Sequence, residues 1–189
     1  ETVLQLLEKV SGAKRRPQED QTSLYSQAVL QDSPSGYWRL NDLSGPTPRQ
    51  AVGKAEARWE EGVAFGLPGV QREGGAISAP PEKPSPFAGP DINRAAHLAG
   101  GRLRVDKPGL GKRYSAEFWF WNALPANARP ITGYLFSRGS EKDNRALGEH
   151  LGIGGTHGDA PAGKLFFYTS NGIGRVVSGK TPLRLLDWH

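Results

Sequence analysis

Short hydrophobic stretches, separated by Gly, Pro, Asn and Asp, dominate the chain from Leu24 onward. Most are as long as an ordinary strand and shorter than most helices. Turn-forming residues recur between them at a spacing that is typical of antiparallel sandwiches and barrels. The expected strands are Tyr37–Leu40, Gly62–Phe65, Ala95–Leu98, Leu103–Val105, Ser115–Asn122, Ile131–Ser137, His150–Ile153, Leu165–Thr169, Arg175–Ser178 and Leu183–Leu185. The pattern therefore predicts an all-β antiparallel sandwich.

The beginning of the chain follows a different pattern. Apolar residues in the first ten positions recur at helical spacing, and Gly12, a residue type that often ends a helix, follows them. Residues 1–12 are therefore predicted to form a short N-terminal helix, the end of a preceding domain. Residues 13–23 are polar and charged and are predicted to form a linker. The sandwich domain is then expected to span residues 24–189.

Composition supports a strand-rich fold. Glycine and proline account for 25 and 15 of the 189 residues, about a fifth of the chain against a typical ~12%. Five of the prolines lie in residues 79–91, which are expected to form an irregular loop. The absence of cysteine excludes disulfides, thiolate metal sites and cysteine nucleophiles. No apolar stretch approaches the ~18 residues that would span a membrane, so no membrane span is expected.

A more specific pattern lies in the segment Ala28–Gly45. It fits the form D-x-P-x-x-Y-W-R-L-x-[ED]-x-S-G, with matches at Asp32, Pro34, Tyr37, Trp38, Arg39, Leu40, Asp42, Ser44 and Gly45. This form resembles the opening of laminin-G-like jelly-roll domains, members of the concanavalin A-like lectin/glucanase superfamily. Further resemblances follow in the family's order at Gly66–Gly69, Ala95–Gly101, Tyr114–Trp121, Leu151–Gly155 with Lys164–Phe167, and Trp188–His189. The resemblance covers residues 24–189 and implies a jelly-roll β-sandwich.

The resemblance also implies something about the end of the domain. In the family, the strand that opens with Trp-His is followed by further strands that close the sandwich, and here Trp188–His189 are the last residues. We therefore expect the C-terminal strands to be missing from this chain. An open jelly roll would leave unpaired strand edges.

The function that the resemblance implies is binding. We expect a non-catalytic binding or adhesion module of a larger exported, bacterial protein, with carbohydrate or another extracytoplasmic protein as its ligand. The implied location is extracellular, on the cell surface or periplasmic, although the chain opens with no signal peptide. Two alternatives stay open: a polysaccharide hydrolase or lyase of the same superfamily, and a structural spacer domain.

The residues argue against catalysis. Hydrolases of the superfamily carry E-x-D-x-x-E on one strand, whereas Glu117 is a lone acid in the matching stretch of this chain. No Gly-x-Ser-x-Gly nucleophile elbow occurs. The glycine-rich residues 152–158 are not followed by a helical pattern, so they are better interpreted as a hairpin turn than as a phosphate-binding loop. We predict that the chain is not an enzyme.

The Phe-Trp-Phe-Trp run at residues 118–121 is the strongest aromatic signal. Four exposed rings would exceed the ~300–600 Å² apolar patch of a typical monomer, so we expect a strand buried on both faces. Strand alternation places Trp119 and Trp121 on one face and the two phenylalanines on the other. If either pair reaches solvent, Trp119 and Trp121 are the candidate ligand-stacking residues.

Positive charge supplies a second candidate binding surface. The net charge is +5, and residues 94–113 hold six basic residues against one acid, Asp106. Arg102 and Arg104 lie two apart, so they share a face if this segment is a strand. They are candidate contacts for anions such as sulfated or uronic polysaccharide or a lipid headgroup. Nucleic acid is disfavoured because no recognition helix or binding module accompanies the charge. The alternative is a solvated outer face.

Calcium is the one candidate cofactor. Many members of the resembled superfamily bind calcium through loop oxygens at the sandwich rim, and Asp143 and Asn144 are the candidate oxygen donors here. No aspartate-rich loop accompanies them. His150 and His157 are seven residues apart, with no His-Glu-x-x-His motif, so a transition-metal site is not expected.

Overall fold

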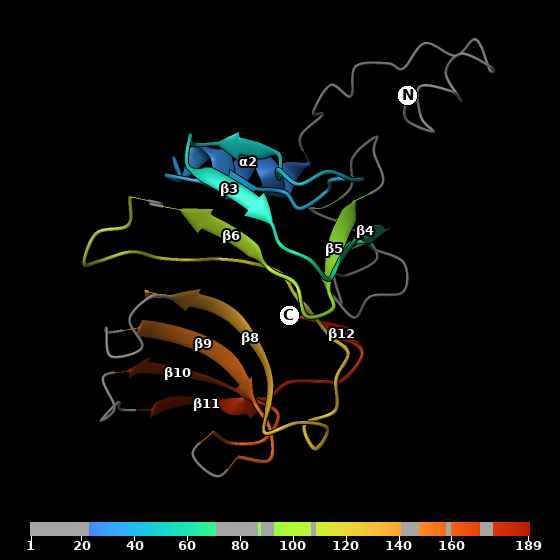
Figure 1. Ribbon diagram of the computed structural model, residues 1–189, viewed down its shortest axis with the longest axis vertical. Coiled ribbons are helices and arrows are strands. Elements are labelled where there is room, and N and C mark those ends of the chain that lie inside the picture. The colour runs from blue at the N-terminus through green and yellow to red at the C-terminus, as the bar shows by residue number, and fades with distance from the viewer. Residues whose placement is uncertain are drawn as a thin grey trace, which may run out of the picture. The chain divides into compact units, whose positions relative to one another are not determined.

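The computed structural model describes residues 23–70, 87, 93–106, 109–140, 148–157, 160–170 and 176–189 (Figure 1). The described residues fall into two compact units. Unit 1 contains those up to Tyr114, and unit 2 contains those from Ser115 to His189. Three predictions concern residues outside those described. They are the N-terminal helix in residues 1–12, the linker as far as residue 22, and the proline-rich loop at residues 79–91 except for residue 87.

Unit 1 begins with the helix α2 (Leu24–Gln31). Its N-terminal end is capped by Ser23, whose hydroxyl accepts a hydrogen bond from the backbone N–H of Ser26 at 3.2 Å. The Ser26 hydroxyl is buried and lies 3.1 Å from the hydroxyl of Tyr37, which connects the helix to the first strand. The sequence pattern gave no helix here, because eight residues are too few to establish a helical period.

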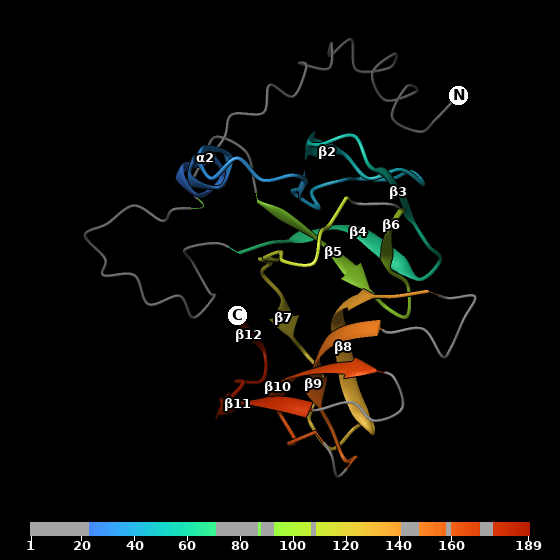
Figure 2. The ribbon, with the colours of Figure 1, turned by 90° about the vertical axis from the view of Figure 1, so that its left-hand side faces the viewer.

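Three antiparallel strand pairs make up the rest of unit 1. Figure 2 labels their strands, apart from β1. The pairs are β1 (Tyr37–Trp38) with β2 (Gln50–Val52), β3 (Glu56–Trp59) with β6 (Leu103–Asp106), and β4 (Val63–Pro68) with β5 (Arg94–Leu98). Trp59 of β3 is buried and contacts Phe65 of β4 edge to face, with ring centroids 5.5 Å apart. This aromatic pair packs two of the strand pairs against each other.

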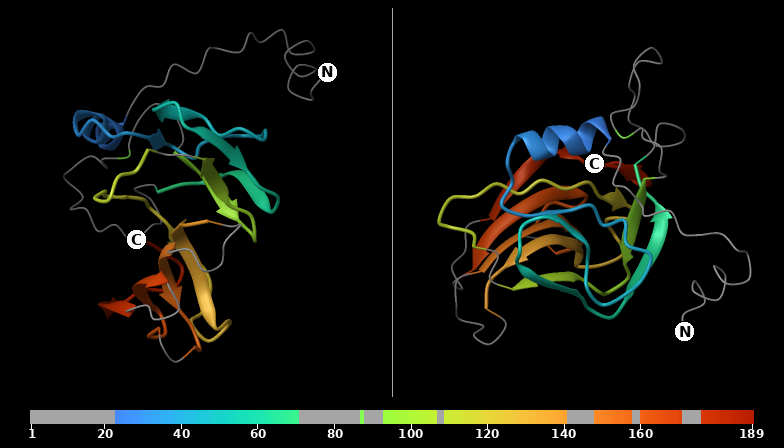
Figure 3. Two further views of the ribbon diagram at one scale, coloured as in Figure 1. Left: turned by 60° about the vertical axis from the view of Figure 1, so that its left-hand side comes forward. Right: turned by 90° about the horizontal axis from the view of Figure 1, so that it is seen from above.

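Unit 2 is built on a four-stranded antiparallel sheet in the order β11-β10-β9-β8, whose strands are curved (Figure 3). The strands are β8 (Ile131–Arg138), β9 (Gly148–Gly154), β10 (Lys164–Ser170) and β11 (Val176–Pro182). A separate pair joins β7 (Trp121–Asn122) to β12 (Asp187–Trp188). β9 and β10 pair antiparallel, and residues 152–154 of the glycine-rich segment form the end of β9 rather than part of a turn.

The strands agree with the sequence pattern most closely in unit 2. Strands expected at Ile131–Ser137, His150–Ile153 and Leu165–Thr169 are present with slightly wider bounds. The prediction of a strand at Ser115–Asn122 is wrong for most of its length, because only its last two residues belong to a strand, β7. The strand expected at Leu183–Leu185 is also wrong, since the pairing with β7 starts at Asp187.

The fold class is therefore confirmed in its coarse form. The described residues are mostly β, all strand pairs between named strands are antiparallel, and one short helix lies near the N-terminal end. The described strands form five separate sheets, and among them no closed sandwich or jelly roll is seen. Two short strands of unit 1, β2 and β3, had no counterpart among the expected strands.

Candidate functional site

A cluster of aromatic side chains lies on one face of the unit 2 sheet. Four rings from three neighbouring strands contact one another: Tyr134 of β8, His150 of β9, and Phe166 and Tyr168 of β10. We call this cluster the aromatic face. Tyr134 lies edge-on to His150 and to Phe166, with ring centroids 5.8 and 6.1 Å apart. His150 stacks on Tyr168 at 4.9 Å. The four rings therefore form one continuous surface.

Strand register explains why these four rings meet. Tyr168 is paired with His150, and both Phe166 and Tyr134 are paired with Gly152, so all four side chains leave the same side of the sheet. Gly152 leaves room for the rings, because a Cβ atom at this position would lie 2.9 Å from the ring of Phe166. Phe166 is only 3% exposed, whereas Tyr134 is 53% exposed. Phe166 thus forms the floor of the aromatic face and Tyr134 its open side.

The other side of the same sheet has a different composition. One end of that side carries Glu149 with its register partners Thr169 and Arg138. The rest of it carries aliphatic and phenyl side chains: Leu151, Ile153, Leu165, Phe167, Phe136 and Val177. Side chains without a polar tip are typical of a face that packs on a core, whereas Tyr and His combine an apolar body with a polar end that stays wet. The sheet is therefore two-sided, and the aromatic face is its amphipathic side.

Polar groups of the aromatic face have shifted acid–base properties. Loss of hydration on burial raises the pKa of Tyr134, and the neighbouring Tyr168 hydroxyl adds to this shift. Loss of hydration also lowers the pKa of His150 below its usual 6.5, which favours the neutral imidazole. The His150 Nδ1 atom lies 3.1 Å from the Ser137 hydroxyl, a hydrogen bond that orients the ring. The face thus presents uncharged hydrogen-bonding groups beside its rings.

The tryptophans expected to stack on a ligand lie elsewhere in unit 2. Trp119 and Trp121 are 36% and 41% exposed, while Phe118 and Phe120 are half-buried. The expected burial of this run on both faces is therefore wrong: most of the run is outside any strand, and its tryptophans reach solvent. Trp121 contacts Trp188 of β12 edge to face at 5.7 Å. Of the two ring pairs, the tryptophans are the more exposed, as expected for the case in which one pair reaches solvent.

The predicted basic residues Arg102 and Arg104 do lie on one face of the β3–β6 pair, but carboxylates lie between them. Arg102 Nε is 2.5 Å from Glu60 Oε2, and Arg104 Nε is 3.0 Å from Asp106 Oδ1. Arg58, directly opposite Arg104, forms an ion pair with Asp106 as well. We call these three arginines and two carboxylates the ionic face.

Mutual neutralisation is the main property of the ionic face. Hydrogen bonds from Arg104 and Arg58 hold the pKa of the Asp106 carboxyl below its usual 3.8, so it stays ionised beside them. Glu60 also lies within 3.8 Å of Arg104 and 3.9 Å of Arg58. Three arginines therefore lie against the carboxylates of Glu60 and Asp106, and a third acid, Glu56, lies opposite Asp106 on the same side of the strand pair. This leaves much less positive potential than the count of basic residues in the sequence indicated.

The calcium prediction lies outside the described residues, since Asp143 and Asn144 fall in the gap between residues 140 and 148. In the part of the chain that the structure describes, no group of three or more His, Asp or Glu side chains is placed to hold a metal ion. The described part of the chain likewise contains no helix with the length and apolar character to traverse a bilayer.

Sequence reasoning missed the aromatic face. Its signal was the placing of rings two residues apart along an expected strand, at Phe166 and Tyr168, together with Tyr134 and His150 on two other expected strands. The alternation could place each ring on a side of its own strand, but only the register between strands brings the rings together. Comparisons with family models, with curated proteins and with solved structures found no match to this chain.

Proposed function

We propose that this chain is a non-catalytic binding module of a larger exported protein, and that its aromatic face binds carbohydrate. The observation that carries the proposal is the contact of four rings over three strands, with Tyr134 half exposed at its open side. The family resemblance at Ala28–Gly45 supports the same class of function, and with it a jelly-roll arrangement of the strands.

Carbohydrate suits this surface chemically. A pyranose ring has an apolar C–H face, which packs on aromatic planes, and a rim of hydroxyl groups that need hydrogen-bonding partners. The tyrosine hydroxyls, the neutral His150 imidazole and Ser137 supply donors and acceptors next to the rings. Because none of these groups is charged, the binding is expected to be insensitive to salt.

A catalytic role finds less support at this face. Glycoside hydrolysis requires two carboxyl groups directed at one cleft. The nearest acid in register, Glu149, is paired with Thr169 and Arg138, which puts it on the opposite side of the sheet, where it forms a 3.4 Å ion pair with Arg138. We therefore propose that the aromatic face binds carbohydrate and does not catalyse its hydrolysis.

Binding to neutral polysaccharides tests the proposal. Affinity electrophoresis against a panel of soluble neutral glucans, xylans and mannans should retard the wild-type protein. Tyr134→Ala should weaken binding to the retarding polysaccharide about tenfold, the effect of losing ~1.4 kcal/mol of ring contact. Val177→Ala is the matched control, because Val177 is 58% exposed on the opposite side of the same sheet.

Two further measurements distinguish binding at the aromatic face from binding at the tryptophans or at the ionic face. Equal retardation of wild type and Tyr134→Ala, combined with loss of binding in a Trp119→Ala/Trp121→Ala variant, would move the site to the tryptophans and overturn the assignment to the aromatic face. Retardation by a sulfated polysaccharide but by none of the neutral ones, lost at 0.5 M salt, roughly the regime in which surface charges are screened within a few ångströms, would indicate the ionic face. No retardation by any polysaccharide would refute carbohydrate binding and favour a protein partner or a spacer.

A further inference from the structure

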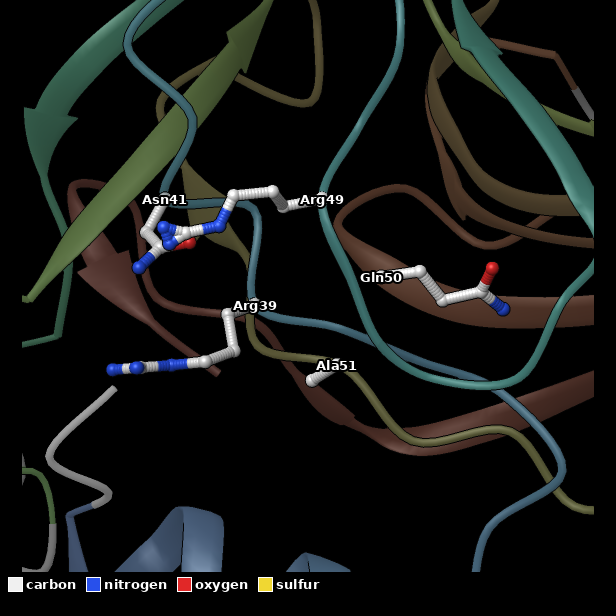
Figure 4. A pocket seen from close by; sticks show the side chains of 5 residues that line it. All are labelled: Arg39, Asn41, Arg49, Gln50 and Ala51. Carbon is white, nitrogen blue, oxygen red and sulfur yellow. The ribbon is translucent and has the colours of Figure 1, made fainter. Parts of the chain in front are cut away.

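Two adjacent leucines are exposed at one turn of unit 2. The shallow hollow of unit 1 that Figure 4 shows is lined mainly by polar side chains. The turn between β11 and β12 is different, because Leu185 and Leu186 stand there with 47% and 63% of their surface exposed. A single exposed leucine is ordinary on a protein surface, whereas two adjacent ones at a turn form an apolar patch of the kind found at contact sites.

The backbone of this turn is held in place on both sides. The Leu186 N–H donates a 2.7 Å hydrogen bond to the carbonyl oxygen of Asn122. The buried Asn122 side chain in turn donates a 3.0 Å hydrogen bond to the carbonyl oxygen of Arg184, and the Nε2 atom of His189 lies 3.0 Å from the same oxygen. The two leucine side chains are therefore exposed on an ordered backbone.

Leucine is an unfavourable choice at position 186. The φ of Leu186 is 55°, in the left-handed region that bulky side chains seldom adopt. Glycine or asparagine would fit this backbone with less strain, and a polar side chain would suit so exposed a position. Because neither backbone preference nor burial within unit 2 favours a leucine here, we infer that its side chain makes a contact outside the chain.

Aromatic residues next to the turn suit a boundary between water and an apolar phase. Trp121 of β7 and Trp188 of β12 are paired, directly beside the hydrogen bond that joins Leu186 to Asn122. The Trp121 side chain is also exposed. Indole rings combine an apolar body with a polar N–H, and for this reason they are enriched where lipid headgroups meet the hydrocarbon of a bilayer.

The charge near the turn is complementary to an anionic surface. Residues 176–189 contain two basic residues, Lys180 and Arg184, and one acid, Asp187. Asp187 is buried and lies 2.6 Å from a guanidinium nitrogen of Arg184, so it offsets one of the two positive charges. The stretch is net positive, and its one carboxylate does not face solvent. Anionic phospholipids attract basic surfaces of this kind.

We propose that the Leu185–Leu186 turn inserts into the surface of a phospholipid bilayer, with the indole rings of β7 and β12 at the level of the headgroups. The strength of such a contact depends on the apolar area that is buried and on the attraction of basic residues to anionic lipids. A bilayer accepts an exposed apolar turn without a matching pocket, which a protein partner would have to supply. This contact is separate from carbohydrate binding at the aromatic face and goes beyond it.

Vesicle flotation tests the contact. Vesicles of phosphatidylcholine mixed with phosphatidylglycerol should float the wild-type protein in a density gradient, and vesicles of phosphatidylcholine alone should float less of it. A Leu185→Ser/Leu186→Asn variant should lower the ratio of bound to free protein about tenfold or more, because it removes the apolar area of both side chains. Leu98→Ser is the matched control, since Leu98 is an exposed leucine of unit 1.

Two measurements accompany the flotation. Asparagine tolerates the left-handed backbone of position 186, so the double variant should keep its Tm or raise it, which shows that lost binding is not lost folding. Lipids with brominated acyl chains quench nearby indole fluorescence. They should quench the bound wild-type protein more than a bound Trp121→Phe variant.

Several results would overturn the assignment. They are no flotation with either kind of vesicle, an equal loss in Leu98→Ser, and flotation that the double variant retains but high salt abolishes, which would show general attraction of a basic protein to anionic lipid. A wild-type dimer in sedimentation equilibrium that the double variant lacks would assign the turn to a second copy of the chain instead. Tyr134→Ala should float like the wild type, so a failure of carbohydrate binding leaves this result unaffected.

Discussion

The ionic face of β3–β6 and the aromatic face of β8–β10 each gather side chains of one kind on one side of antiparallel strands: charged groups on the first, uncharged rings on the second. On the ionic face, Arg102 and Arg104 share the carboxylates of Glu60 and Asp106, so most of the charge is compensated within the sheet. On the aromatic face, Tyr134 presents an uncharged ring to solvent. Cross-strand ion pairs can neutralise a basic surface, whereas rings that stack on one another remain available to a further ring.

The comparison has an energetic side as well. Exposed ion pairs contribute roughly 0–1 kcal/mol each, because water and salt screen them. A buried aromatic ring contributes several times more through the apolar area it removes from water. The aromatic face therefore combines a stabilising floor with an accessible side, while the ionic face contributes little to either stability or anion attraction. Four substitutions or conditions test this contrast.

The largest effect is expected from Phe166→Ala. The ring is 3% exposed and contacts both Tyr134 and Tyr168, so its removal leaves a cavity and should lower the free energy of unfolding of unit 2 by about 3–5 kcal/mol. Urea denaturation followed by tryptophan fluorescence measures this. Tyr134→Ala, at the exposed side, should cost about 1 kcal/mol or less. Similar losses of unfolding free energy in the two variants would contradict the conclusion that Phe166 is the buried floor of the aromatic face and Tyr134 its open side.

A smaller loss of stability is expected when a side chain fills the space beside the Phe166 ring. In Gly152→Ala the new Cβ would lie 2.8 Å from the Gly133 carbonyl oxygen and 2.9 Å from the Phe166 ring. Such overpacking costs roughly 1–3 kcal/mol, which thermal unfolding would report as a lower Tm. Gly133→Ala is the control, since a Cβ there meets no atom within 4 Å. An unchanged Tm in Gly152→Ala would show that the rings are not seated as described.

Removing a carboxylate should expose the positive charge of the ionic face. Glu60→Gln breaks ion pairs to Arg102, Arg104 and Arg58, whose partial exposure limits the stability loss to about 1 kcal/mol or less. The more informative readout is the salt concentration that elutes the protein from heparin resin, which should rise. Arg138 and Glu149 offer a control pair in unit 2, where Glu149→Gln makes the same change of charge. An equal rise in both variants would mean that net charge alone matters.

The smallest effect concerns pH. Because the pKa of His150 is lowered in the folded protein, the unfolded chain binds a proton more readily, so stability should fall as the pH drops below about 6.5. Urea midpoints measured between pH 7.5 and 5 test this. His150→Gln should flatten the dependence over this interval. A wild-type midpoint that rises on acidification would contradict the shift assigned to this imidazole.

Much of the local structure was predictable. Alternating apolar residues located β8, β9 and β10 within a few residues. The strand expected at Ser115–Asn122 failed for most of its length because aromatic content does not by itself make a strand, and β7 comprises only Trp121 and Asn122. Helix α2 was missed because it is held by a serine cap and by Tyr37 rather than by a long apolar period.

The order of the residues was enough to predict the strand-rich class and the side of its own strand on which a residue such as Tyr134 or Arg104 lies, because side chains alternate along an extended backbone. Which residues of distant strands meet became known only from the folded structure. Glu60 lies beside Arg102, and His150 beside Tyr168, through the register of strand pairs. Register depends on turns and bulges. The pairing of strands, and not the sequence of any one strand, therefore determines whether the charges of a surface are neutralised or its rings stay accessible.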